Sequence, residues 1–196
     1  LADEINRAPA KVQSALLEAM QERQVTLGDE THRLPEPFLV LATQNPIEYL
    51  GTYPLPESQL DRFLMRIALG YPAAEEERRL LVSGGADRVL AGVRPVLTLT
   101  ELRQAQEAVE RVVVAEKLLD YVMAVVQRTR ATRDLVLGVS PRGAQGLFRA
   151  VQAHALVAGR PFATPDDVKR VAPAVLAHRI LASATGRYEG TGAGRR

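Results

Sequence analysis

The sequence has 196 residues, a formal net charge of +2, 46% hydrophobic residues, 24% charged residues and no cysteine. This composition is ordinary for a globular protein, and the small net charge gives no reason to expect nucleic acid or a membrane surface as a partner. The absence of cysteine excludes disulfides and thiolate metal sites and favours the cytoplasm, and no apolar run approaches the roughly 20 residues that membrane insertion requires.

The chain begins with Leu1-Ala2 followed at once by an acidic pair, Asp3-Glu4. A buried strand has about five to six residues, so if Leu1-Ala2 ends such a strand, most of that strand is missing. The alternative interpretation is a frayed helix with an acidic start. Pro9 suits the first turn of the next helix. That helix should run to about Arg23, with one apolar face made of Val12, Leu16, Ala19 and Met20.

A hairpin and a buried strand are predicted after this helix. Residues 24–27 and 31–34 flank the turn-forming pair Gly28-Asp29, which is typical of a short β-hairpin. The continuous apolar run at 38–43 then predicts a strand that is covered on both faces of a parallel sheet. It ends just before Asn45.

The next segment contains a loop, a short helix and a last strand. The loop at 46–56 is rich in proline and glycine, a helix is expected at 57–63, and a strand at 64–69. After Gly70-Tyr71-Pro72 only helical patterns remain. We therefore expect an α/β fold in two parts, with part of a parallel-sheet domain at 1–70 and an all-α domain at 71–196.

Capping signals divide the second part into about five helices. The expected starts and stops are a helix at 73–83 stopped by Gly84-Gly85, a start at Thr98 or Thr100, an apolar stripe at 118–126, a start at Ser140-Pro141 with an end at Gly159, and a start at Thr164-Pro165. Pro173 should break or restart the last helix. The tail from Gly186, rich in glycine and arginine, is expected to be disordered.

Polar side chains stand where two of the predicted strands end. Asp3-Glu4 follows the first strand and Asn45 follows the strand at 38–43. In open α/β sheets, ligands bind outside the carboxyl ends of the strands. A carboxylate pair there can hold Mg²⁺ through water and accept a proton from an attacking water, and an amide can orient that water.

Four motifs carry a resemblance to a known family. The longest is the run from Leu1 to Pro9 together with Gln13 to Glu22, and the shorter ones are Ala42-Thr43-Gln44-Asn45-Pro46, Leu60-Asp61-Arg62-Phe63 and Ser140-Pro141-Arg142-Gly143. In order and spacing they resemble the Walker B segment, sensor 1, the arginine-finger segment and sensor 2 of MoxR-type AAA+ ATPases. The resemblance extends to about Ile180 and implies a partial AAA+ P-loop NTPase core followed by a helical lid.

The resemblance implies a role for each of five residues. Asp3 would help to bind Mg²⁺, Glu4 would activate the hydrolytic water, and Asn45 would position that water or sense the γ-phosphate of ATP. Arg62 would reach the ATP of a neighbouring subunit, and Arg142 would contact phosphate from the same subunit or the next. The hairpin at 24–34 corresponds to the insertion before sensor 1 in this branch, facing a ring pore or a client.

The family implies chaperone-like ATP hydrolysis that matures partner complexes, in a ring expected to be a hexamer, with von Willebrand factor A domain proteins as partners. The phosphate-binding loop G-x-x-x-x-G-K-[ST] is absent from these residues. We therefore expect the chain to be a fragment, inactive alone, of a cytoplasmic ATPase. Two alternatives remain: a nucleotide-free interaction module, and a magnesium-chelatase-type motor, against which the unbroken stretch from Glu4 to Glu22 argues.

Structural interpretations stand beside the functional ones. Arg62 could form a surface ion pair with Asp61, and Arg142 could lie in the first turn of a solvent-facing helix. The three histidines are too scattered for a metal site, and we interpret them as structural or surface residues. The arginines at 128, 130 and 133 have no aromatic residues among them and favour a solvated face over a nucleic-acid site.

Overall fold

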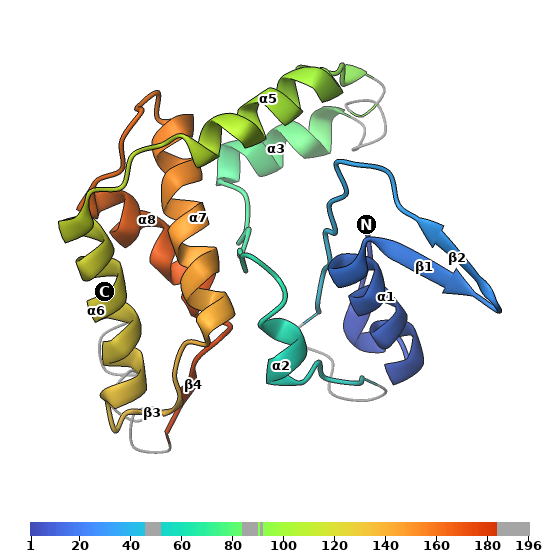
Figure 1. Ribbon diagram of the computed structural model, residues 1–196. Helices are drawn as coiled ribbons and strands as arrows, with labels where there is room; N and C mark the ends of the chain where they lie inside the picture. Colours follow the sequence, from blue (N-terminus) through green and yellow to red (C-terminus); the bar gives the residue numbers. More distant parts are fainter. Residues whose placement is uncertain (46–51, 84–89, 91, 184–196) are drawn as a thin grey trace.

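The computed structural model describes residues 1–45, 52–83, 90 and 92–183 (Figure 1). Helix α1 and a β-hairpin form one side of the molecule, and helices α6, α7 and α8 form the other. The short helix α2 (Glu57–Leu60) lies between them in this view, and α3 (Ala74–Ser83) and α5 (Leu99–Glu110) both extend toward one end of the molecule. The expected loop at 46–51, the Gly84-Gly85 stop and the tail from Gly186 fall outside the described residues.

The N-terminal part has a helix and a hairpin where the sequence predicts them. A 3-10 turn at Ile5–Arg7 precedes α1 (Ala10–Glu22), which is followed by β1 (Gln24–Leu27) and β2 (Glu30–Arg33). The two strands pair antiparallel, with Gln24 opposite Arg33 and Leu27 opposite Glu30. Gly28 adopts a φ of 62° in the turn, a conformation that glycine adopts without strain.

The buried face of α1 differs from the predicted one. Val12 is 53% exposed, whereas Gln13 is buried at 3%. The Gln13 amide donates hydrogen bonds to the backbone oxygens of Ile5 (3.2 Å) and Tyr53 (2.9 Å). These bonds satisfy the buried amide, so a polar residue occupies a position that periodicity assigns to the surface.

The two strands predicted at 38–43 and 64–69 are not strands in the described structure. Among the described residues, the segment 38–43 makes parallel pairing only through an isolated bridge between Ala2 and Ala42. A ladder needs partners along its length, and among the described residues the segment 38–43 has a partner only at its end. Residues 64–69 lie beside the lid instead, where the Arg66 N–H donates to the Ala174 carbonyl at 2.8 Å. The parallel sheet that we expect from the sequence is therefore not confirmed.

The described residues from Ala74 to Ala182 form a mostly helical part of the molecule, which we call the lid. Its elements, with the short helix that leads to it, are α2 (Glu57–Leu60), α3 (Ala74–Ser83), α5 (Leu99–Glu110), α6 (Glu116–Ala131), β3 (Leu135–Leu137), α7 (Pro141–Val157), α8 (Pro165–Leu176) and β4 (Leu181–Ala182). Strands β3 and β4 pair antiparallel. The core lies between α6, α7 and α8, where Val126, Leu147, Val151 and Val175 have no exposed surface.

Caps fix where these helices begin. Thr98 starts α5 with a capping box to Glu101, and the Ser140 hydroxyl accepts from the Gly143 N–H to start α7. The expected break at Pro173 is wrong, because α8 continues to Leu176. Because proline has no N–H, Pro173 removes one hydrogen-bond donor near the end of the helix. The helix still continues, and the Pro173 carbonyl accepts from the Ala177 N–H.

A buried carboxylate ties α8 to α7. Asp167 is 1% exposed and accepts hydrogen bonds from Arg160 Nη2 (2.5 Å), Thr164 N (2.7 Å) and Thr164 Oγ1 (2.8 Å), while His154 Nδ1 lies 2.6 Å away. These contacts, that with Arg160 above all, hold the pKa of Asp167 well below its usual range. The lid therefore binds this carboxylate in its ionised form.

We predict that Asp167→Asn lowers the free energy of unfolding at pH 7 by about 3 kcal/mol, because it leaves a partly buried Arg160 without its counter-charge. A lowered pKa stabilises the fold fully above the pKa of the unfolded carboxyl, about 3.9, and this contribution is lost progressively as pH falls from there toward the lower pKa of the folded state. Urea titrations from pH 7 to pH 3 should therefore show a smaller acid-induced loss in the variant than in the wild type.

Asp166→Asn is the matched control for this experiment. Asp166 pairs with Lys169 at 3.1 Å, but its side chain is 88% exposed, so its removal should change the free energy of unfolding by less than about 0.5 kcal/mol. Equal effects of the two variants would contradict the role given to Asp167.

Candidate functional site

The acidic pair and the predicted water-positioning residue lie at one edge of the N-terminal part. The Ala2 N–H donates to the Leu41 carbonyl (2.7 Å), and the Thr43 N–H donates to the Ala2 carbonyl (3.0 Å). The Ile5 N–H continues the contact to the Thr43 carbonyl at 3.0 Å. These bonds run the two segments parallel, so Asp3 and Glu4 lie beside Thr43.

Thr43 organises this edge, and sequence reasoning gave it no role. Its hydroxyl donates to Asp3 Oδ1 at 2.5 Å and accepts from the Glu4 N–H at 2.8 Å. One side chain thus fixes both acidic residues. The only signal in the sequence is that a hydroxyl-bearing residue ends the apolar run just before Gln44-Asn45.

Glu4 and Asn45 are each held by their surroundings. Glu4 has a φ of 47°, a left-handed conformation that is uncommon outside glycine, and its carboxylate pairs with Arg7 Nε at 2.8 Å. The Asn6 side-chain amide donates to the Asn45 carbonyl at 3.3 Å, which brings Asn45 to the same edge. Strained backbone of this kind is concentrated at functional sites.

The donor set at this edge suits a hard cation bound through water. Asp3 is exposed and is adjacent to the Thr43 hydroxyl, and both offer oxygen. Within the described residues no group of three or more histidine, cysteine or carboxylate side chains could form a closed metal cage. Mg²⁺ usually keeps several waters and takes one or two carboxylates together with substrate phosphates. The residues present therefore fit Mg²⁺ as part of a phosphate complex.

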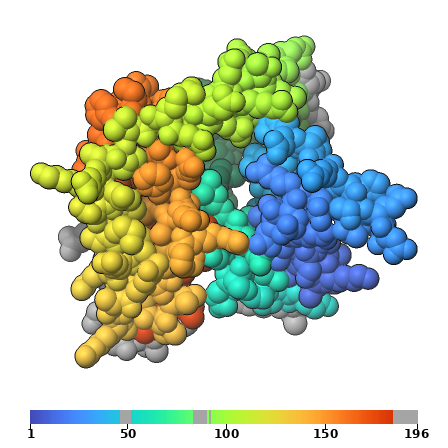
Figure 2. All heavy atoms as spheres, in the orientation of Figure 1, coloured from blue at the N-terminus to red at the C-terminus, as the bar shows by residue number. Residues whose placement is uncertain are grey.

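The two predicted arginines meet at a different place. Arg62 and Arg142 line a hollow of about 380 Å³ together with Met20, Gln21 and Glu22 at the end of α1. Figure 2 shows that the N-terminal part, in blue, and α7, in orange, approach each other beside an opening in the molecule. The Arg62 Nε is buried and has no hydrogen-bond partner among the described residues. Two arginines thus line the hollow, and the buried Nε of one of them has no hydrogen-bond partner among the described residues.

Helix α1 separates this hollow from the acidic edge. Gln13 contacts Ile5, next to Glu4, whereas Gln21 lines the hollow. Their separation of eight residues along α1 corresponds to about 12 Å at about 1.5 Å per residue. Along α1, the hollow and the acidic edge are thus about two helical turns apart.

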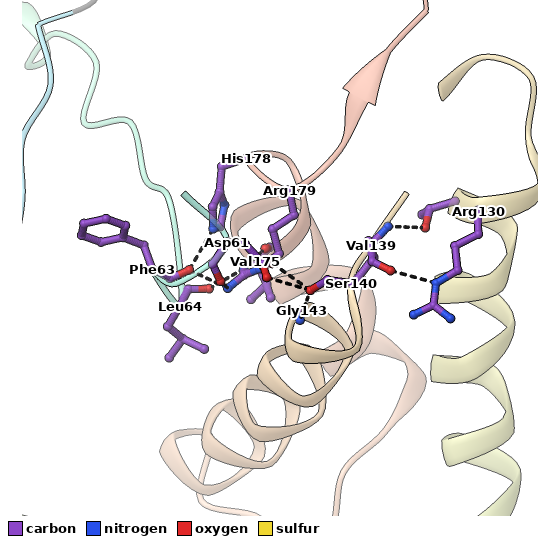
Figure 3. Close-up of polar contacts among 11 residues, drawn as sticks. Asp61, Phe63, Leu64, Arg130, Val139, Ser140, Gly143, Val175, His178 and Arg179 are labelled. Atoms are coloured by element: carbon purple, nitrogen blue, oxygen red, sulfur yellow. Dashed lines mark hydrogen bonds and ion pairs between the residues drawn. The ribbon is translucent and has the colours of Figure 1, made fainter. Parts of the chain in front are cut away.

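The segment that carries Arg62 is bound to the lid (Figure 3). Asp61 accepts from Arg179 Nε at 3.0 Å and from the Ser140 hydroxyl at 2.8 and 2.9 Å, so its carboxylate is paired with Arg179 and not with Arg62. His178 Nε2 lies 2.9 Å from the Phe63 carbonyl. Burial lowers the pKa of His178, and its neutral ring donates to that carbonyl. The sequence patterns assign no role to Arg179 and predict only a structural or surface role for His178.

Comparison with known proteins shows which family the chain belongs to. Residues 1–65 match the ATPase family associated with various cellular activities (AAA), and residues 127–192 match the AAA lid domain. The chain is 48% identical to Chaperone MoxR1 of Mycobacterium tuberculosis over 92% of its length, and 34% identical to Protein MoxR of Paracoccus denitrificans over 92%. The chain belongs to the MoxR family of AAA+ ATPases.

Other relatives of this MoxR-family chain agree with the assignment. It is 44% identical to the uncharacterized protein YeaC of Bacillus subtilis over 97% of its length. A crystal structure from Cytophaga hutchinsonii, described provisionally as an ATPase, superposes with a TM-score of 0.84 at 40% identity and covers 96% of the chain. The chain spans 59% of YeaC, 50% of MoxR1, 59% of the Paracoccus protein and 60% of the crystallised chain.

Among the residues that the structure describes, no helix is both long and apolar enough to cross a membrane.

We predict that Thr43→Val lowers the free energy of unfolding by about 1 kcal/mol, because it removes a hydroxyl that makes two hydrogen bonds at the acidic edge. Thr43→Ser keeps the hydroxyl and should stay within about 0.5 kcal/mol of the wild type. Chemical denaturation measures both variants. If the serine variant were as unstable as the valine variant, the methyl group and not the hydroxyl would be what stabilises this edge.

Proposed function

We propose that this chain supplies the hydrolysis and sensing residues of an ATPase subunit. The parallel contact between Ala2 and Ala42 carries the proposal, because it brings Asp3, Glu4 and Asn45 to one edge. Residues 1–70 would belong to the AAA+ core and residues 71–196 to the lid. ATP is the nucleotide that the family binds, and Mg²⁺ would neutralise charge on its phosphates.

Each residue at the edge has a chemical task in this proposal. Asp3, oriented by the Thr43 hydroxyl, would bind the hydrated cation. Glu4 would accept a proton from the attacking water as a general base, after its carboxylate leaves Arg7. Asn45 would donate to or accept from the same water through its side-chain amide.

Arg62 and Arg142 would act on the ATP of a neighbouring subunit. They share one hollow that lies about two turns of α1 away from the acidic edge, so a nucleotide held at Asp3 and Glu4 is out of their reach in the same copy. A guanidinium group can donate two parallel hydrogen bonds to phosphate oxygens, and its positive charge neutralises the negative charge that develops in phosphoryl transfer. Glu22 in the hollow offsets part of this positive charge. The arrangement supports a closed ring, for which we propose a hexamer.

The work done by hydrolysis would be chaperone-like remodelling of partner complexes. One relative bears the name Chaperone MoxR1, and von Willebrand factor A domain proteins are the partner class that we propose. The exposed β1–β2 hairpin (Figure 1) offers a surface for such a client. Because the sequence contains no phosphate-binding loop, we also propose that the 196 residues alone bind Mg·ATP weakly and do not hydrolyse it.

We predict that Glu4→Gln and Arg62→Ala each lower kcat for ATP hydrolysis by the full-length protein by about 10³-fold, since the first removes the base and the second removes a transition-state charge partner. A coupled phosphate-release assay measures both. Mixing the two inactive variants should restore part of the activity, because an intact Glu4 on one subunit then meets an intact Arg62 on the next.

Arg149→Ala is the control for this experiment, because Arg149 is another lid arginine, half exposed, that pairs with Glu110 at 3.1 Å. Its kcat should match the wild type. Full activity of Glu4→Gln or Arg62→Ala would refute the site assignment, and mixed variants that remain inactive would refute action between subunits.

A further inference from the structure

A buried guanidinium, that of Arg179, makes four hydrogen bonds to the loop that carries Arg62. We propose that Arg179 is a positioning residue for Arg62: it holds the Arg62 loop on the lid, so that Arg62 and Arg142 keep a fixed spacing and act on phosphate as one unit. The inference rests on the proposed function, in which these two arginines contact a nucleotide.

The contacts of Arg179 lie on both sides of Arg62 in the chain. Before it, Arg179 Nε binds the Asp61 carboxylate at 3.0 Å, and Nη2 binds the Asp61 carbonyl at 3.0 Å. After it, Nη2 binds the Phe63 carbonyl at 2.6 Å, and Nη1 binds the Leu64 carbonyl at 3.0 Å. With the Phe63 carbonyl bound also by His178, the backbone around Arg62 has little freedom to move relative to α8.

Asp61 transmits this attachment to the start of α7. The Ser140 hydroxyl donates to both Asp61 oxygens and also accepts from the Gly143 N–H at 3.0 Å. Asp61 immediately precedes Arg62, and Ser140 stands two residues before Arg142. A direct side-chain contact therefore joins the segments that present the two arginines to the hollow (Figure 3).

The first turn of α7 is shaped to receive Arg179. A Cβ at Gly143 would lie 2.8 Å from Arg179 Cδ and 2.8 Å from Val139 Cγ1, which is closer than carbon atoms pack. Only a residue without a side chain leaves room here. The backbone of Val139 is in turn hydrogen-bonded to α6. Arg130 Nε donates to the Val139 carbonyl at 2.8 Å, and the Val139 N–H donates to Thr129 Oγ1 at 3.1 Å. The turn from Val139 to Gly143, which contacts Arg179, is thus itself bound to α6 of the lid.

The charges also favour this assignment. Arg179 is 5% exposed, and Asp61 is the carboxylate that compensates it. Burial lowers the pKa of Arg179 and the nearby charge of Arg142 acts in the same direction, whereas Asp61 opposes both. Because Asp61 is committed to Arg179, it does not neutralise Arg62, whose guanidinium stays available to an anion.

Steady-state ATP hydrolysis by the full-length protein tests the inference. Arg179→Met should lower kcat by about 10- to 100-fold with little change in KM for Mg·ATP, because misplacement of about 1 Å costs rates of this order. In the Arg62→Ala background the same change should have less than about a twofold effect, since there is no arginine left to position. Mixing Arg179→Met with Glu4→Gln subunits should restore activity, as it does for Arg62→Ala.

Arg160→Met is the matched control. It removes a different arginine–carboxylate contact of the lid, between the partly buried Arg160 and Asp167, which lies away from Arg62. It should leave kcat near the wild-type value below its melting temperature. Gly143→Ala is the second variant, for use if Arg179→Met does not fold. The added Cβ displaces Arg179 but leaves every hydrogen-bond partner of Arg179 present. This variant should show the same fall in kcat and the same dependence on Arg62.

The outcomes separate the two claims. Arg62→Ala without effect would overturn the proposed function and, with it, the role of Arg179. A strong effect of Arg62→Ala beside normal activity of Arg179→Met and Gly143→Ala would overturn the inference alone. An equal loss from Arg179→Met with and without Arg62 would also overturn it, because Arg179 would then act on something other than Arg62.

Discussion

Burial of the Arg179 guanidinium imposes the main constraint on this structure. A buried charge is costly unless it is paired and hydrogen-bonded. Arg179 obtains its partners from the Asp61 carboxylate and from the backbone oxygens of Asp61, Phe63, Leu64 and Val175. The segment before the proposed domain boundary at residue 70 must therefore lie on the lid. Arg66 extends the same attachment through its bond to Ala174. The segment that carries Arg62 is therefore hydrogen-bonded to the lid, although in sequence it precedes the proposed boundary.

This attachment explains why the candidate site residues form two separate sets. Asp3, Glu4 and Asn45 are positioned by short-range contacts around Thr43 within the N-terminal part. Arg62 and Arg142 are positioned by the lid and face the far end of α1. Helix α1 acts as the spacer between the two sets. In the function that we propose, a subunit built in this way would offer its acidic edge to one nucleotide and its arginines to another, an arrangement that suits a ring of identical subunits.

The sequence predicts local structure well here and long-range contacts poorly. The helix starts at Ser140 and Thr164 follow from caps that act within one turn. The strands at 38–43 and 64–69 were wrong because a strand depends on its neighbours, which composition alone does not supply. The Asp3–Glu4–Asn45 edge was predicted from strand ends, and the structure brings these residues together. Thr43 and Arg179 were not predicted, because their roles depend on partners about 40 and 115 or more residues away.

Each of the four residues in the short motif Ser140-Pro141-Arg142-Gly143 has its own structural role. The serine caps α7 and also binds Asp61, the arginine faces the hollow, and the glycine makes room for Arg179. Pro141, which lacks an N–H, occupies a position where that donor would have no partner in the helix. Each residue type is therefore required for a different physical reason, and three of the four reasons concern the placement of Arg62 and Arg142. The hollow itself is bounded by α1 on one side and by lid-bound arginines on the other, so its width is set by how the lid sits against α1. An anion that binds both guanidinium groups would thus stabilise one relative position of these two parts of the molecule.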